Sequence, residues 1–126
     1  MMEQNFADKK IIVVDDESDI RESVKNILED NNFKVETAKD GKDFIKKISK
    51  SKFDLIILDI LMPGLTTKEI IAELNKKKIK TPIIFLTVVR FAEQTKEMIA
   101  PQMADYIEKP FDNSDFITRV KKALKK

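Results

Sequence analysis

The sequence predicts a doubly wound α/β fold, with a five-stranded parallel sheet in the order 2-1-3-4-5 flanked by five helices. The alternation of two kinds of segment predicts it. Short, strongly apolar segments alternate with longer segments whose apolar residues recur at helical spacing. Such alternation is typical of strand–helix–strand units, which form parallel sheets with right-handed crossovers. The chain has 126 residues, which suits one domain, so we expect a single domain over residues 1–126.

The five strand segments are of two kinds. Residues 11–14, 55–58 and 83–86 are apolar throughout, whereas residues 33–37 and 105–108 alternate between apolar and polar side chains. Continuous apolar segments suit strands that are buried on both faces of a parallel sheet, and alternation suits an edge strand. The second and fifth strands therefore lie at the edges, which gives the order 2-1-3-4-5.

Helical patterns lie between the strand segments. Apolar residues recur every three or four positions over residues 20–28, 44–48, 70–74 and 116–124. A weaker pattern over residues 91–101, ended by Pro101, predicts a short and loosely held fourth helix. Ser18 or Asp19 is expected to cap the first helix, and Asn113 or Ser114 the last.

Composition excludes several kinds of chemistry. The chain has no cysteine and no histidine, so it has no disulfide, no thiolate metal site and no histidine base. Only 2 glycines are present, and no glycine-rich phosphate loop exists, which argues against dinucleotide and P-loop NTPase functions. The formal net charge of +2 gives no reason to expect binding of nucleic acid or membrane. No signal peptide or membrane-length apolar stretch occurs, which predicts a cytoplasmic protein.

Three carboxylates are predicted to converge at one end of the sheet. In a doubly wound sheet, ligands bind at the carboxyl ends of the strands where strand order reverses, here between strands one and three. Asp15 and Asp16 follow strand one, and Asp59 follows strand three. A lone aspartate after a strand is usually a cap or turn residue, but both strands flanking the reversal end in aspartate. Crowded carboxylates repel, and a hard cation such as Mg²⁺ would neutralise them.

Two more polar residues lie at the carboxyl ends of strands four and five, at the same end of the sheet. Thr87 closes strand four, and Lys109 follows strand five. Taken singly, they are an ordinary strand threonine and a surface lysine. Together they place a hydroxyl and an ammonium beside the acids, where the ammonium can pair with a carboxylate and then with a phosphoryl oxygen. A carboxylate beside a metal and a cation can act as a nucleophile and form an acyl phosphate.

The sequence resembles the receiver domains of two-component response regulators, which have a flavodoxin-like fold. Four motifs carry the resemblance, which extends over about residues 9–125: VDDE at 14–17, LDILMPG at 58–64, TPIIFLT at 81–87 and YIEKPF at 106–111. Each motif alone is weak. All four in order, each at the end of a predicted strand, make the resemblance specific.

The resemblance implies a role for each acidic residue. Asp59 would accept the phosphoryl group. Asp15, Asp16 and Asp59 would hold Mg²⁺ together with the backbone carbonyl of Leu61 and water. The expected activity is that of a signalling switch and not of an enzyme, with only self-phosphorylation and self-dephosphorylation.

The resemblance also implies how the signal leaves the site. Lys109 would contact the phosphoryl oxygens and precede a cis peptide bond with Pro110. Thr87 would move to hydrogen-bond the phosphoryl group, and Tyr106 would turn inward as the aromatic switch. The fourth helix, fifth strand and fifth helix would form the surface that responds.

The implied partners are proteins. A sensor histidine kinase or a phosphotransfer protein would donate the phosphoryl group, and a downstream protein or a fused output domain would read it. The sequence leaves open whether the chain acts alone or is one domain of a larger protein. The face from the fourth to the fifth helix suits either a homodimer interface or a solvated surface.

Several residues depart from the family pattern. Val88 stands where the family usually has alanine or glycine, which would narrow access to the phosphoryl group. Leu61 and Val89 are apolar where the family tunes hydrolysis, so we expect slow autodephosphorylation. Thr67 stands where family members often have glycine, and the nearest glycine is Gly64.

Three other functions compete with the receiver hypothesis. A degenerate receiver, acting as a phosphorylation-independent binding module, is the main alternative, and Val88 is the residue that favours it. A Mg²⁺-dependent phosphatase with an aspartate nucleophile usually needs a second aspartate at the position of Leu61. A flavin-binding domain of this topology would need a hydroxyl-rich loop after strand one, which the chain lacks.

Overall fold

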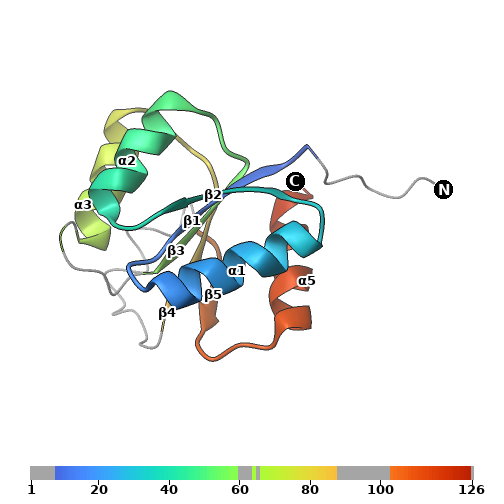
Figure 1. Cartoon of the computed structure of the whole chain (residues 1–126). Coiled ribbons are helices and arrows are strands. Elements are labelled where there is room, and N and C mark those ends of the chain that lie inside the picture. The colour runs from blue at the N-terminus through green and yellow to red at the C-terminus, as the bar shows by residue number, and fades with distance from the viewer. Residues whose placement is uncertain (1–7, 60–63, 65, 88–102, 126) are drawn as a thin grey trace.

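Five parallel strands form one sheet at the centre of the molecule (Figure 1). The structure is a computed structural model that describes residues 8–59, 64, 66–87 and 103–125. The strands are β1 (Lys10–Val14), β2 (Lys34–Ala38), β3 (Leu55–Asp59), β4 (Ile83–Thr87) and β5 (Met103–Glu108). All neighbouring pairs are parallel, and the order is β2-β1-β3-β4-β5. The predicted strand order is therefore confirmed.

Helices cover both faces of the sheet. The described helices are α1 (Ser18–Asp30), α2 (Gly41–Lys50), α3 (Thr67–Lys76) and α5 (Asn113–Leu124). Figure 1 shows α2 and α3 on one face and α1 and α5 on the other. The fourth helix expected over residues 91–101 lies outside the described residues. No helix in the described ranges is long and apolar enough to cross a membrane.

The two faces of the sheet bury separate hydrophobic clusters. Alternate residues of a strand point to opposite faces, so one apolar strand supplies both clusters. In β1, Ile12 and Val14 pack toward α2 and α3, whereas Ile11 and Val13 pack toward α1 and α5. All residues of β3 are buried, whereas β2 is largely half-exposed. This difference is the physical reason that continuous apolar segments marked the inner strands and alternation marked the edges.

Side chains at the helix starts fix where three of the four described helices begin. Thr66 and Glu69 form a reciprocal capping box at the start of α3, and Asp40 accepts a hydrogen bond from the Asp43 N–H at the start of α2. Thr67, where the family often has glycine, is the first residue of α3.

The predicted caps of the first and last helices were wrong, because the N-cap residue lies one position before the first candidate in each case. Asp112 caps α5 by accepting from the Asp115 N–H, so Asn113 already lies in the helix. Glu17 precedes α1, and its side chain forms no capping hydrogen bond. Several neighbouring residues at each start can act as caps, and the direction from which the chain enters the helix decides which one does.

The cap of α5 should make stability depend on pH. The Ser114 hydroxyl, and then the Asp115 N–H, donate to Asp112 and lower its pKa from the ordinary 3.8. Because the folded state holds this proton less tightly, the carboxylate stabilises the fold fully above the unfolded pKa. This stabilisation is lost as the pH falls through the lowered pKa. We expect Asp112→Ala to melt at a lower temperature than wild type at neutral pH, with a difference that shrinks in acid.

Circular dichroism melts over a pH series measure this difference. Asp30→Ala, which removes an exposed carboxylate at the far end of α1, is the control and should show no such trend. A melting difference between Asp112→Ala and wild type that stays constant with pH would contradict the assignment of the cap.

Candidate functional site

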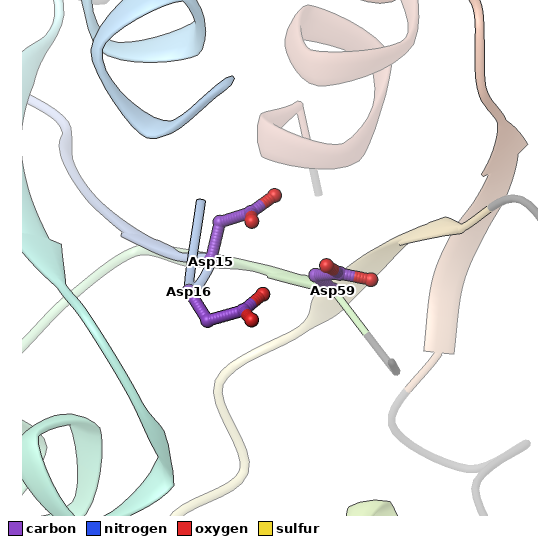
Figure 2. A group of neighbouring side chains, drawn as sticks. All are labelled: Asp15, Asp16 and Asp59. Carbon is purple, nitrogen blue, oxygen red and sulfur yellow. The ribbon is translucent and has the colours of Figure 1, made fainter. Parts of the chain in front are cut away.

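Three carboxylates converge at the carboxyl end of the sheet (Figure 2). Asp15 and Asp16 directly follow β1, and Asp59 is the last residue of the neighbouring strand β3. One carboxylate oxygen from each residue lies within 4.8 Å of the other two. Asp15 is 2% exposed and Asp59 5%, whereas Asp16 is open to solvent. The predicted convergence is confirmed, and it forms a site with a buried floor and an exposed rim.

Lys109 brings a cation into this acidic site. Its Nζ atom lies 3.1 Å from Asp15 Oδ2 and 3.5 Å from Asp59 Oδ2, and its side chain is only 11% exposed. The peptide bond between Lys109 and Pro110 is cis, as expected from the resemblance. The ammonium therefore bridges carboxylates from two different strands. Because both carboxylates are buried, this pairing is stronger than a surface ion pair.

All four polar groups of Asp15 have partners. Its N–H donates to the Ala38 carbonyl at 3.2 Å, which ties the end of β1 to the end of β2. Its Oδ1 accepts from the Glu17 N–H at 2.9 Å, and its Oδ2 accepts from Lys109. Its carbonyl accepts from Arg21 Nη1 at 2.8 Å. Asp15 is thus held in one orientation from every side.

The sequence patterns did not predict two contacts of Asp15. They did not identify Glu17 as a hydrogen-bond donor, and they did not identify Arg21 as a residue of the site. Glu17 contributes its main-chain N–H to Asp15, a contact that any residue type can make. One feature of the sequence could have indicated Arg21. An arginine in the first turn of a helix is unfavourable for the helix dipole, which suggests that a local partner compensates it.

The residues present fit a hard divalent cation. The three carboxylates carry more negative charge than the single ammonium of Lys109 balances. Such like charges repel at this distance, and an additional cation would relieve the repulsion. The ligand atoms that these three residues offer are carboxylate oxygens, which Mg²⁺ prefers over softer ligands. The expected backbone ligand, Leu61, lies outside the described residues.

The two predicted switch residues lie on neighbouring strands. Thr87 is the last residue of β4, at the same end of the sheet as the acids, and it pairs with Glu108 of β5. The side chain of Thr87 is not among the described ones. Tyr106 pairs with Phe85 and packs, half-buried, against the cluster beneath α2 and α3. Val88 and Val89 lie outside the described residues.

Residues 11–121 match the family model of the response regulator receiver domain. The chain belongs to the response regulator receiver domain family. Among its relatives is the Bacillus subtilis transcriptional regulatory protein ResD, 37% identical over 117 residues that cover 93% of this chain and 48% of ResD. The alkaline phosphatase synthesis transcriptional regulatory protein PhoP of the same organism is 36% identical over 120 residues, covering 94% of this chain and 49% of PhoP. The receiver chain thus spans about half the length of these curated relatives.

Solved structures agree with this family. The Thermotoga maritima response regulator TrrA, in complex with Mg²⁺–BeF, is 36% identical with a TM-score of 0.80, and the match covers 92% of this chain and 99% of TrrA. The Vibrio cholerae chemotaxis protein CheY4 is 34% identical with a TM-score of 0.82, and the match covers 93% of this chain and 99% of CheY4. The predicted receiver fold is confirmed, and the chain is a signalling domain and not a classical enzyme.

Removing the Lys109 ammonium should destabilise the metal-free receiver domain and strengthen cation binding. In Lys109→Ala, Asp15 and Asp59 would stay buried without their shared cation. Breaking a buried pair in this way costs up to about 3–5 kcal/mol. Mg²⁺ should bind the variant more tightly, because the ammonium no longer competes for the same carboxylates.

Urea unfolding with and without Mg²⁺ measures both effects. Lys122→Ala, which removes an exposed lysine of α5, is the matched control and should behave as wild type. If Lys109→Ala matched wild type in metal-free stability and in its response to Mg²⁺, the proposed charge balance would be wrong.

Proposed function

We propose that Asp59 accepts a phosphoryl group in a Mg²⁺-dependent reaction and that its new charge switches a protein-binding surface. The donor would be the phosphohistidine of a sensor histidine kinase or phosphotransfer protein, in the cytoplasm, with residues 1–126 acting as one domain. One observation carries the proposal. The buried carboxylate of Asp59 lies beside Asp15 and Asp16, and the Lys109 ammonium lies 3.5 Å from its Oδ2. Nucleophile, ligand oxygens and countercation are thus together in one site.

The chemistry needs little beyond these groups. A carboxylate oxygen of Asp59 attacks the phosphorus atom, and an O–P bond forms as the P–N bond of phosphohistidine breaks. The imidazole leaves with the electron pair and takes up a proton from solvent. The products are an acyl phosphate on Asp59 and neutral histidine.

The charges of the site suit the transferred group. A phosphoryl group carries roughly −2 charge, and the nearly buried Lys109 ammonium can pair with its oxygens. Asp15, Asp16 and Asp59, with the expected carbonyl of Leu61, would hold Mg²⁺. Bound Mg²⁺ would act as a Lewis acid that stabilises the charge developing on the phosphoryl oxygens.

Thr87 and Tyr106 are the proposed switch. Thr87 ends β4 beside Asp59, the last residue of β3, and Tyr106 is half-buried on the adjacent strand β5. A hydroxyl drawn toward the phosphoryl group would leave space that an aromatic ring can enter. The responding surface would include β5 and α5, and it would contact a downstream protein, a fused output domain or a second copy. The fourth-helix part of this surface lies outside the described residues.

An apolar groove beside the site supports docking of a donor protein. It has a volume of about 570 Å³ and runs between α1 and the segment that connects β5 to α5. Its lining is mainly apolar, with Ile20, Ile27 and Phe111 among its residues. Lys109 lines the same groove and also pairs with Asp59, so one side chain connects the groove to the acceptor. We propose that the helix bearing the donor histidine packs here, because its phosphoryl group must reach Asp59.

Intact-mass analysis tests the acceptor. After incubation with a small acyl phosphate, wild type should gain one phosphoryl group only when Mg²⁺ is present, and Asp59→Asn should gain none. Asp30→Asn, which changes an exposed carboxylate far from the site, should label as wild type does. Decay of the adduct then reports its lifetime, which Leu61 and Val89 predict to be long. No adduct under any condition would favour the phosphorylation-independent binding module, with blocked access at Val88 as the first explanation to test.

Ser23→Glu tests the docking groove without disturbing the core. Ser23 is an exposed residue of α1 that lines the groove. A charge there should slow transfer from a phosphorylated kinase by at least about ten-fold, since charges are disfavoured in the core of an interface. Labelling by a small acyl phosphate should not change. Ser49→Glu, an exposed serine of α2 on the other face, is the matched control. Normal kinase transfer to Ser23→Glu would rule the groove out as the docking surface.

A further inference from the structure

Arg21 contacts the main chain of the acidic site. It is the fourth residue of α1 and half-buried, and its Nη1 donates to the Asp15 carbonyl at 2.8 Å. Within the part of the chain that the structure describes, Arg21 forms no ion pair. Its guanidinium is therefore directed at a peptide carbonyl although the site beside it is rich in carboxylates.

The position of Arg21 is unfavourable for the helix itself. The first turn of a helix favours acidic residues, because its free N–H groups give it a partial positive charge. The start of α1 also lacks a side-chain cap at Glu17. Helix stability therefore does not explain an arginine at this position, whereas the hydrogen bond to the Asp15 carbonyl does.

The bond acts on the peptide unit that joins two of the three acids. The carbonyl of Asp15 and the nitrogen of Asp16 belong to one rigid plane. Fixing the carbonyl therefore fixes the direction in which the chain enters Asp16. Asp15 is also held through its N–H and its carboxylate. The Asp16 side chain is exposed and makes no hydrogen bond or ion pair with another described residue, so its placement depends on its backbone.

We propose that Arg21 is a positioning residue for the cation site: it holds the Asp15–Asp16 peptide so that the Asp16 carboxylate faces Asp59. This inference rests on the proposed function, in which these carboxylates hold Mg²⁺. Arg21 is not a ligand in this account, and it acts only through the Asp15 carbonyl. Outer partners of this kind typically change metal affinity by about 10–100-fold.

The direction in which Mg²⁺ affinity changes when Arg21 is replaced distinguishes a positioning role from a purely electrostatic one. As a bare positive charge near the site, Arg21 would repel Mg²⁺, and its removal would tighten binding. As a positioning residue it strengthens binding, and its removal would weaken it. Arg21→Met suits the test, because it keeps an unbranched side chain that packs along the helix but removes both the charge and the donors.

Calorimetric Mg²⁺ titration of the whole chain tests the proposal. We expect Arg21→Met to bind Mg²⁺ about ten-fold more weakly than wild type, and Arg21→Lys to recover part of the loss. Arg119→Ala is the matched control, because this arginine of α5 pairs with Asp105 and Asp115 instead. Its Mg²⁺ affinity should equal that of wild type. Unchanged or tighter binding by Arg21→Met would overturn the inference.

Amide NMR spectra of the metal-free chain keep this test separate from the proposed function. Arg21→Met should shift or broaden the amide signals of Asp16 and Glu17 more than those of β4, whereas Arg119→Ala should leave them unchanged. If wild type bound no Mg²⁺, the proposed metal site would fail, and these signals would still decide the role of Arg21. Amide signals of Asp16 and Glu17 that match wild type in Arg21→Met would overturn it.

Discussion

The Lys109 ammonium, shared between Asp15 and Asp59, is the interaction on which the acidic site depends. Two nearly buried carboxylates face each other at the ends of neighbouring strands, and charges in such a position must be compensated. One lysine compensates them only in part, which leaves the site with excess negative charge. In the proposed function, the same lysine would pair with a phosphoryl group on Asp59. The stability of the metal-free site, the proposed cation binding and the proposed phosphoryl acceptance therefore all depend on Asp15, Asp59 and Lys109.

The sheet brings these side chains together. Strands β1 and β3 are buried on both faces. Residues 11–14 of β1 and 55–58 of β3 are all apolar, and the acids follow at the carboxyl ends. At that edge the connections from β1 and β3 lead to helices on opposite faces, α1 and α3 (Figure 1). The carboxylates of Asp15, Asp16 and Asp59 lie together at this end of the sheet (Figure 2). Lys109 directly follows β5, the edge strand on the far side of β4.

ResD and PhoP match this chain over only part of their length. The match to ResD and PhoP covers about half of each of those proteins, so their names describe more than the shared part. The shared part is the receiver domain, and TrrA, a receiver of this fold, is known in complex with Mg²⁺–BeF. The proposed chemistry rests on this chain's own carboxylates and lysine, and the proposed output of the signal depends on contacts of β5 and α5 with other proteins.

The pattern of apolar and polar residues in the sequence was enough to predict the strand order and the residues of the acidic site. Uninterrupted apolar segments distinguish inner strands from edge strands. The carboxyl ends of parallel strands necessarily lie at the same end of the sheet. Asp15, Asp16, Asp59 and Lys109 could therefore be grouped from the sequence alone. Only the tertiary structure decided that Lys109 bridges Asp15 and Asp59, that Asp112 caps α5 where Asn113 or Ser114 was expected, and that Arg21 holds the Asp15 carbonyl. These contacts depend on side-chain directions and on distances between elements far apart in the chain, which periodicity does not encode.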